Sequence, residues 1–150
     1  MATRRNRPAA QRVRKVVAYI TFGDRLLVFN ETGCPEAGVQ VPAGTVEANE
    51  ELPDAVLREA MEETGLDNLE LVEYLGTKDI DGNKVACRGE LHERHFFHLK
   101  CANPAPENWR HYEMFPSGPN KAPIAYDLYW VKKDEAKLYF DFGALLEKLG

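Results

Sequence analysis

The chain has 150 residues, of which 44% are hydrophobic and 29% charged, and this suits one soluble domain that buries its own core. Its net charge of −5 argues against a broad electrostatic contact with nucleic acid, and no apolar run approaches the roughly 20 residues that cross a bilayer. Three cysteines without close spacing favour neither a disulfide framework nor a zinc knuckle, so we expect a reducing, cytoplasmic compartment.

The segment from Met1 to Lys15 is basic and contains no acidic residue. Its basic residues are Arg4, Arg5, Arg7, Arg12, Arg14 and Lys15. Organelle transit peptides are also rich in arginine, but this segment is short, is interrupted by Pro8 and lacks an apolar stripe. We expect residues 1–12 to form a disordered basic arm and residues 13–150 to form a single domain.

Runs rich in β-branched, aliphatic and aromatic residues predict strands in much of the remaining chain. These strands are Arg14–Phe22, Arg25–Asn30, Val39–Val41, Leu69–Ile80, Glu93–Cys101 and Ala125–Val131. Gly23-Asp24 predicts a hairpin between the first two, and Asp81-Gly82-Asn83 predicts a turn. The proline-rich segment from Asn103 to Pro123 predicts a long connection with little regular structure, of a kind that is often functional.

Two helices are also predicted. One runs from near Pro53 to Thr64, because proline suits a first helical turn and Gly65 suits a left-handed cap at the far end, with Asn49 as a candidate N-cap. The other closes the chain, where apolar residues recur at helical spacing: Phe142, Leu145, Leu146 and Leu149. This order of elements indicates an α/β (α+β) fold in which a mixed sheet packs between helices.

The first helix carries three carboxylates within five positions, Glu59, Glu62 and Glu63. Neighbours three and four apart on a helix repel when they carry like charges, so stability does not explain this cluster. Mg²⁺ and its relatives prefer oxygen ligands, which such a cluster supplies. We expect the carboxylates to face outward together, with Arg58 at the margin. The opposite, apolar arc should pack against the sheet: Val56, Leu57, Ala60 and Met61.

The stretch from Gly44 to Leu66 resembles the signature box of the Nudix hydrolases, which cleave a nucleoside diphosphate linked to another group. All fixed positions of that box are present: Gly44, Glu50, Arg58, Glu59, Glu62, Glu63 and Gly65. The aliphatic positions hold Leu66 and Ala60, and Ala60 is smaller than the usual residue. The resemblance implies an α/β/α sandwich and a pyrophosphohydrolase that uses Mg²⁺ or Mn²⁺.

The resemblance also implies roles for the box residues. The implied metal ligands are a backbone carbonyl of Ala43 or Gly44 and three glutamates: Glu59, Glu62 and Glu63. Arg58 would orient a neighbouring glutamate through a bidentate pair. Glu47 and Glu50 would support the site or bind a further metal ion.

The general base that takes a proton from the attacking water stays open, because Nudix members use either a glutamate of the helix or one from a distant loop. Glu62 or Glu63 is the first choice, which makes Arg58, Glu62 and Glu63 the predicted catalytic residues. The candidates on loops are Glu107, Glu113 and Asp127.

Histidines and aromatic residues beyond the box carry weaker signals. His92, His95 and His98 do not predict zinc, because alternation along a strand places His95 on the opposite face from the other two. Trp109 and Tyr112 are candidates for stacking on a base or sugar of the substrate, with packing in the core as the alternative.

The predicted function is hydrolysis of a small-molecule nucleoside diphosphate derivative to a nucleoside monophosphate and a second phosphorylated fragment. The alternative is a nucleotide-sensing or RNA-binding module, or an enzyme acting on RNA 5′ ends, which only the basic arm supports. Neither the proline of ADP-ribose-type members nor the tyrosine of dinucleoside polyphosphate members stands shortly after the box, so the substrate stays open. No membrane association is expected, and a homodimer through edge strands is possible.

Overall fold

The computed structural model describes residues 12–81, 91–103, 105–114, 116 and 122–150. This part of the chain contains seven strands: β1 (Arg12–Phe22), β2 (Arg25–Glu31), β3 (Ala43–Thr45), β4 (Leu69–Asp81), β5 (Leu91–Cys101), β6 (Asn108–Glu113) and β7 (Ile124–Lys132). It also contains one α-helix and four 3₁₀ helices: α2 (Leu52–Thr64), η1 (Pro35–Ala37), η2 (Lys133–Glu135), η3 (Phe140–Gly143) and η4 (Leu146–Leu149). The predicted arm, apart from Arg12, and the turn after Asp81 lie outside the described residues.

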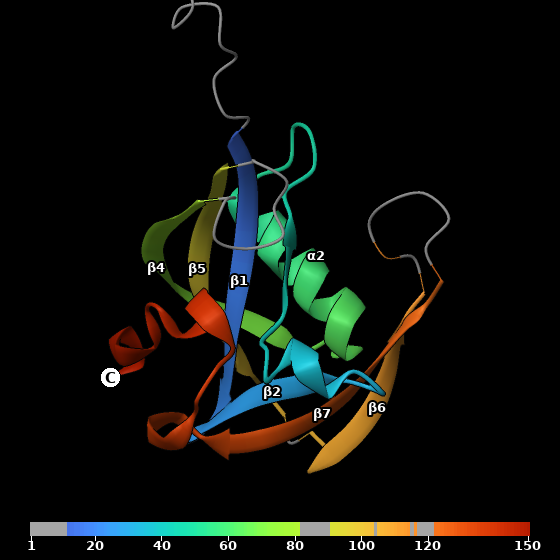
Figure 1. Cartoon of the computed structure of the whole chain (residues 1–150). Helices are drawn as coiled ribbons and strands as arrows, with labels where there is room; N and C mark the ends of the chain where they lie inside the picture. The colour runs from blue at the N-terminus through green and yellow to red at the C-terminus, as the bar shows by residue number, and fades with distance from the viewer. Residues whose placement is uncertain (1–11, 82–90, 104, 115, 117–121) are drawn as a thin grey trace, which may run out of the picture.

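The strands form one mixed sheet in the order β4-β5-β1-β2-β7-β6, with β3 paired to β1. β1 runs parallel to β5, and the other strand pairs in the described part are antiparallel. β2 pairs with β1 only beside the Gly23-Asp24 turn, because β3 occupies the same edge of β1 from Lys15 to Val17. The strands β2, β7 and β6 therefore turn away from β1 (Figure 1), and the predicted mixed α+β sheet is confirmed.

Two apolar clusters cover the two faces of the sheet, because successive strand residues point to opposite sides. On β1, Val16 and Ala18 belong to the cluster that packs against α2. Val17 and Tyr19 belong to the other cluster, which contains Leu145 and is covered by the C-terminal segment. Figure 1 shows α2 and the C-terminal segment on opposite sides of β1. The sheet is therefore the middle layer, with an α-helix on one side and 3₁₀ turns on the other.

The predicted closing helix is wrong in type, because this segment forms the separate turns η3 and η4. The hydroxyl of Tyr19 donates to the carbonyl of Phe142 at 2.5 Å and accepts the N–H of Leu145 at 3.3 Å. A continuous α-helix would need both backbone groups for its own ladder. A side chain from β1 therefore replaces helical hydrogen bonds at the point where the helix is interrupted.

The third strand is displaced from its predicted position at Val39–Val41. Only Gln40 pairs there, through two backbone hydrogen bonds of 2.9 Å with Phe29, and the strand itself is Ala43–Thr45. Pro42 lies between them and has no N–H to donate, so the ladder is interrupted at this residue. The chain consequently passes from the edge of β2 to the edge of β1 just before Gly44.

The segment predicted to be irregular, Asn103–Pro123, contains β6. This strand pairs with β7 over its whole length. Its side chains alternate, so that Trp109, His111 and Glu113 are more buried than their neighbours. Because His111 and Glu113 are polar, the alternation of apolar and polar residues that predicts a strand is absent from the sequence of β6.

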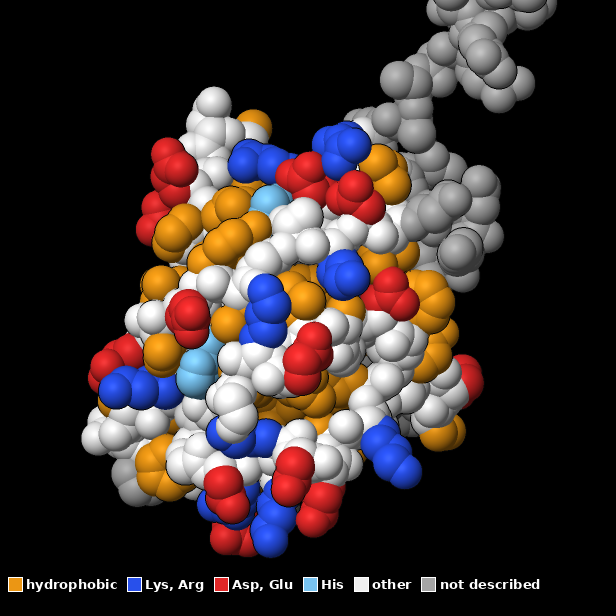
Figure 2. Space-filling view, turned by 90° about the vertical axis from the view of Figure 1, so that its left-hand side faces the viewer, with side chains coloured by type: hydrophobic (Ala, Val, Ile, Leu, Met, Phe, Trp, Pro, Cys, Tyr) orange, Lys and Arg blue, Asp and Glu red, His pale blue; other side chains and the backbone are white. Residues whose placement is uncertain are grey.

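The face that carries β4 and the C-terminal segment mixes apolar and charged side chains (Figure 2). Leu71, Val72 and Tyr74 of β4 are exposed. Charged groups interrupt the apolar ones on this face, and the homodimer stays a prediction. Within the described residues, no helix combines the length and apolar character needed to cross a bilayer.

We expect Leu145→Ala to lower the free energy of unfolding by about 2–5 kcal/mol, because Leu145 is a buried residue of the second cluster. Leu71→Ala is the matched control on an exposed site, with an expected change of about 0.5 kcal/mol or less. Urea unfolding followed by circular dichroism measures both. Equal effects in the two variants would show that the C-terminal segment does not form a packed layer.

Candidate metal and catalytic site

α2 turns two of its carboxylates toward the sheet. Glu59 and Glu63 are buried, at 6% and 7% exposure, whereas Met61 is 48% exposed. The predicted arcs are therefore wrong for Glu59, Glu63 and Met61. Seven residues advance a helix to within about 20° of two full turns, so Glu63 shares the buried face with Val56.

Glu63 is fixed to the backbone of β3. Its Oε1 accepts the N–H of Ala43 at 2.9 Å. Burial raises the pKa of Glu63 well above its usual value of 4.5; the bond from Ala43 opposes this shift, and the charges of Glu113 and Glu59 add to it. Ionised Glu63 is therefore unfavourable unless a cation lies close by.

Gly44 lies so close to Glu59 that no other residue fits. A Cβ added to Gly44 would stand 2.0 Å from the carboxyl carbon of Glu59. Here the glycine is needed for the close approach of backbone and carboxylate. This contact places the backbone of Gly44 among the carboxylates, in keeping with the carbonyl ligand that the resemblance implies.

Arg58 holds several carboxylates with one guanidinium. It forms a bidentate pair with Glu50, from Nε to Oε2 at 2.8 Å and from Nη2 to Oε1 at 2.9 Å. Its Nη1 donates to Glu59 at 2.9 Å and to Glu62 at 2.8 Å. The hydrogen bonds from Arg58 lower the pKa of Glu50 to about 2. Arg58 is therefore anchored by Glu50 while it orients two glutamates of the cluster.

Glu113, at the end of β6, joins the buried pair. It is 9% exposed, and one oxygen each from Glu59, Glu63 and Glu113 lie within 4.8 Å of one another. Tyr126 of β7 donates to Oε1 of Glu113 at 2.9 Å. In the sequence, Glu113 is only one of three loop candidates for the base, because nothing local to it marks a metal site.

When ionised, Glu59, Glu63 and Glu113 carry more negative charge than the single positive charge of Arg58 neutralises. Burial raises the pKa of Glu59 to about 7, and the hydrogen bond from Arg58 opposes that shift. At neutral pH three buried carboxylates need either protons or further positive charge, since the effective cost of burying an ion is several kcal/mol. A set of carboxylate oxygens fits a hard cation such as Mg²⁺ or Mn²⁺.

Two side chains of β6 dock this strand on the end of α2. Trp109 donates its indole N–H to the carbonyl of Thr64 at 2.9 Å, and His111 donates from Nε2 to the carbonyl of Glu62 at 2.9 Å. Carbonyls in the last helical turn lack partners within the helix, so both contacts act as caps. They also fix where Glu113 meets the helix.

The aromatic residues predicted to bind substrate face different ways. Trp109 packs against the cluster beneath α2, and its N–H is engaged. Tyr112 is 52% exposed and points to the other side of β6. A substrate contact for Trp109 or Tyr112 stays a prediction, and of the two only Tyr112 presents much of its ring to solvent.

The carboxylates line a cavity of about 330 Å³. Its walls are formed by Thr45, Val46, Glu47, Arg58, Glu59, Glu62 and Glu113. The side chain of Glu47 is mostly exposed, with its Oε2 3.9 Å from Nη1 of Arg58. The structure thus brings the predicted glutamates and Arg58 to this cavity or to direct contacts beside it, and their roles as ligands or catalysts stay predictions.

The predicted histidines make other contacts. His95 is 2.8 Å from Glu93, and His98 is 2.7 Å from Thr21. In the part of the chain that the structure describes, only one group of three His, Cys, Asp or Glu side chains is placed to share an ion. It consists of Glu59, Glu63 and Glu113.

The other loop candidates for the base lie outside the carboxylate cavity. Asp127 forms an ion pair with Arg110 at 2.7 Å, and Glu107 is exposed. The observation that separates Glu113 from both is its burial beside Glu59 and Glu63.

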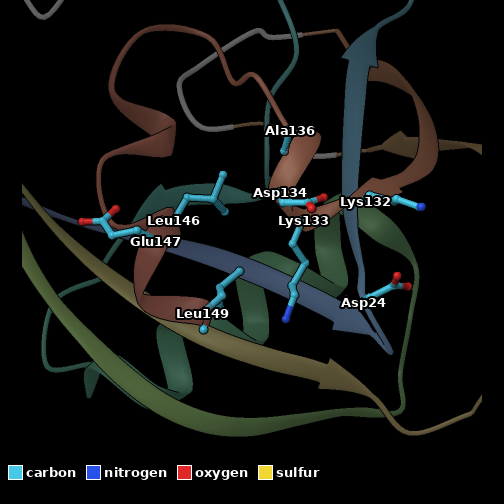
Figure 3. Close-up of a pocket in the computed structure, with 9 residues that line it drawn as sticks. Asp24, Lys132, Lys133, Asp134, Ala136, Leu146, Glu147 and Leu149 are labelled. Atoms are coloured by element: carbon cyan, nitrogen blue, oxygen red, sulfur yellow. The ribbon is translucent and has the colours of Figure 1, made fainter.

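A larger cavity, of about 520 Å³, lies between the end of β7 and the C-terminal turns. In Figure 3 the side chain of Lys133 extends toward Leu149, and Asp24 lies nearby. Lysines, acids and leucines alternate around it, so it offers no concentrated set of metal ligands.

A family model for the NUDIX domain matches residues 11–140. The chain belongs to the Nudix family. This result confirms the resemblance carried by Gly44 to Leu66 and the expected enzyme class, a hydrolase of phosphorus anhydrides. A search of curated protein sequences finds no significant match.

Several solved structures are similar to this Nudix domain. A MutT Nudix hydrolase from Burkholderia pseudomallei has 23% identity and a TM-score of 0.64, and the match covers 93% of this chain and 99% of that one. A UDP-X diphosphatase has 18% identity and a TM-score of 0.61, with 99% of this chain but only 64% of that one covered. An Ap4A hydrolase from C. elegans has 19% identity and a TM-score of 0.58, with 94% and 96% covered. These likenesses establish the Nudix fold.

We expect metal-free protein to lose stability as the pH rises from about 5 to about 8, because the raised pKa values of Glu59 and Glu63 make the folded state bind more protons than the unfolded state. Their stabilising protonation is complete below the usual value of 4.5, and for Glu59 it is lost as the pH passes about 7. The lowered pKa of Glu50 affects stability between its usual value of 4.5 and about 2, which lies below this pH window. Glu63→Gln should reduce this loss.

Thermal melting in EDTA between those pH values measures the effect, with Glu51→Gln as a control on an exposed glutamate of the same helix start. If Glu63→Gln and Glu51→Gln melt like the unmodified protein at every pH, the buried-carboxylate account is contradicted.

Proposed function

We propose that this Nudix domain hydrolyses the pyrophosphate bond of a nucleoside diphosphate linked to another moiety, with Mg²⁺ or Mn²⁺ as cofactor. The observation that carries the proposal is the buried group of Glu59, Glu63 and Glu113 beside the backbone of Gly44. Such a group is costly for stability alone, and it suits divalent ions that neutralise a diphosphate.

The proposed ligands are Glu59, Glu62, Glu63 and Glu113, together with the carbonyl of Ala43 or Gly44. Bound divalent ions would screen the negative charge of the diphosphate and acidify a bound water. Arg58 would act on the ligands, since it holds Glu59 and Glu62 at hydrogen-bond distance while Glu50 anchors it. Glu47, at the rim, would serve a further ion or support the site.

Glu62 is the proposed general base. Its side chain is 35% exposed and lines the cavity, whereas Glu63 is buried and accepts a backbone N–H. A base must reach the water that it activates, which favours the more exposed of the two carboxylates. Arg58 would hold Glu62 toward that water.

The similar solved structures do not choose among substrates. Their names cite UDP-X, Ap4A and, for a protein from Streptococcus suis with 18% identity and a TM-score of 0.57, ADP-ribose. The TM-scores are comparable, so the proposal stays with the shared chemistry, an anhydride between two phosphates attached to a nucleoside.

We expect Glu63→Gln and Glu113→Gln each to lower kcat/KM by about a hundredfold or more, because each removes a proposed metal ligand. A screen of nucleoside triphosphates, dinucleoside polyphosphates and nucleotide sugars, with Mg²⁺ and Mn²⁺ compared, identifies the substrate for this measurement. Glu107→Gln is the control, since Glu107 is exposed and outside the cavity. Full activity in both ligand variants, or in excess EDTA, would contradict the proposal.

A further inference from the structure

Each of the three buried carboxylates accepts one hydrogen bond, and in each case the acceptor is the Oε1 atom. The donors to Glu59, Glu63 and Glu113 come, in that order, from three different elements: Arg58 of α2, the N–H of Ala43 in β3 and the hydroxyl of Tyr126 in β7. Within the described residues, no hydrogen bond reaches the Oε2 atom of any of the three. Each carboxylate therefore keeps one oxygen for a further partner.

Tyr126 is the one donor of the three that lies far along the sequence from Gly44–Leu66. It is directly opposite His111 in the pairing of β6 with β7, and Glu113 stands two residues further along β6 on the same face. Such diagonal neighbours stay within reach of aromatic and other long side chains. The bond between Tyr126 and Glu113 is thus set by the register of two strands that follow α2.

Packing holds the ring of Tyr126 in place. The residue is 7% exposed, and its ring centroid lies 4.5 Å from that of Phe29, with 44° between the ring planes. On the same strand, the hydroxyl of Tyr129 donates to a neutral acceptor, the amide oxygen of Asn30, at 2.6 Å. Tyr126 instead donates to a carboxylate, and a hydrogen bond to an ionised acceptor is the stronger kind. Its hydroxyl therefore stabilises ionised Glu113, which is the form that binds a cation.

The engaged Oε1 atoms bear on the kind of ion that this group accepts. A hydrogen bond to one oxygen fixes the plane of a carboxylate and leaves the other oxygen for the ion, which favours binding through a single oxygen of each side chain. Mg²⁺ is small, requires nearly octahedral geometry and keeps several waters, whereas Ca²⁺ takes about 6–8 oxygen ligands and also accepts both oxygens of one carboxylate. Three carboxylates that each offer one oxygen therefore suit the smaller ion.

We propose that Tyr126 is a positioning residue of the metal site. Its hydroxyl holds Glu113 so that this carboxylate offers one oxygen, which favours Mg²⁺ and Mn²⁺ over Ca²⁺. Tyr126 acts through Glu113 rather than as a ligand itself. The proposal rests on the proposed function, and it adds to the site a residue that the motif from Gly44 to Leu66 does not contain.

Metal binding by the full chain without substrate tests this role. In Tyr126→Phe, the dissociation constant for Mn²⁺, measured from the EPR signal of the free ion, should rise about tenfold, the loss expected when a ligand loses its hydrogen-bond partner. The dissociation constant for Ca²⁺, measured by competition with Mn²⁺, should stay within about twofold, because a released Glu113 offers Ca²⁺ both oxygens. Equal losses for the two ions, or unchanged Mn²⁺ binding, would overturn the proposal.

Tyr129→Phe is the matched control, since it removes the same hydroxyl from the same strand at a bond to Asn30 instead of a carboxylate. It should bind both ions like the unmodified protein, and an equal loss of Mn²⁺ binding in this control would also overturn the proposal. Both variants keep the aromatic ring, so thermal melting in EDTA should show both of them folded. A Tyr126→Phe chain that fails to fold would assign the hydroxyl to stability and contradict the positioning role.

A double-mutant cycle checks that Tyr126 acts through Glu113. In the Glu113→Gln background, adding Tyr126→Phe should change the dissociation constant for Mn²⁺ by less than about twofold, because the carboxylate that the hydroxyl positions is already absent. A further loss of about tenfold would show that the hydroxyl acts elsewhere. Absence of Mn²⁺ binding by the unmodified protein would contradict the proposed function itself, whereas binding that Tyr126→Phe leaves unchanged contradicts only the role of Tyr126.

Discussion

Glu59, Glu63 and Glu113 are buried together, where water does not solvate them fully and their charges repel one another. Arg58 offsets part of that repulsion, but Glu50 takes a bidentate share of the same guanidinium. The remaining imbalance is removed either by protons or by a bound cation. This competition links the stability of the metal-free domain to pH and, under the proposed function, links catalysis to metal binding.

Much of the fold keeps these three carboxylates in place. Gly44 leaves room for Glu59, and the N–H of Ala43 holds Glu63. Glu113 comes from a different part of the chain, and it is positioned by Tyr126 and by the docking of β6 on the last turn of α2. The sheet supports both α2 and the C-terminal turns. One of its faces packs against α2 and the other against the C-terminal turns.

The residues from Gly44 to Leu66 could be predicted from the sequence because the motif is local: every fixed position lies in one short strand, the loop after it, one helix or the glycine that caps that helix. Glu113 was recognised only as one of three candidates, since it reaches the site through the pairing of β6 with β7. The prediction of a closing helix was wrong, because the hydroxyl of Tyr19, near the other end of the chain, forms hydrogen bonds with the carbonyl of Phe142 and the N–H of Leu145. Local periodicity describes a helix or a strand well, but it carries no information on such distant partners.

The most direct test of the central claim is anomalous diffraction from crystals grown with Mn²⁺. The account predicts a manganese peak bonded to carboxylate oxygens of Glu59, Glu63 and Glu113, next to the carbonyl of Ala43 or Gly44. A map in which manganese binds elsewhere, while these three side chains keep their places without an ion between them, would contradict it.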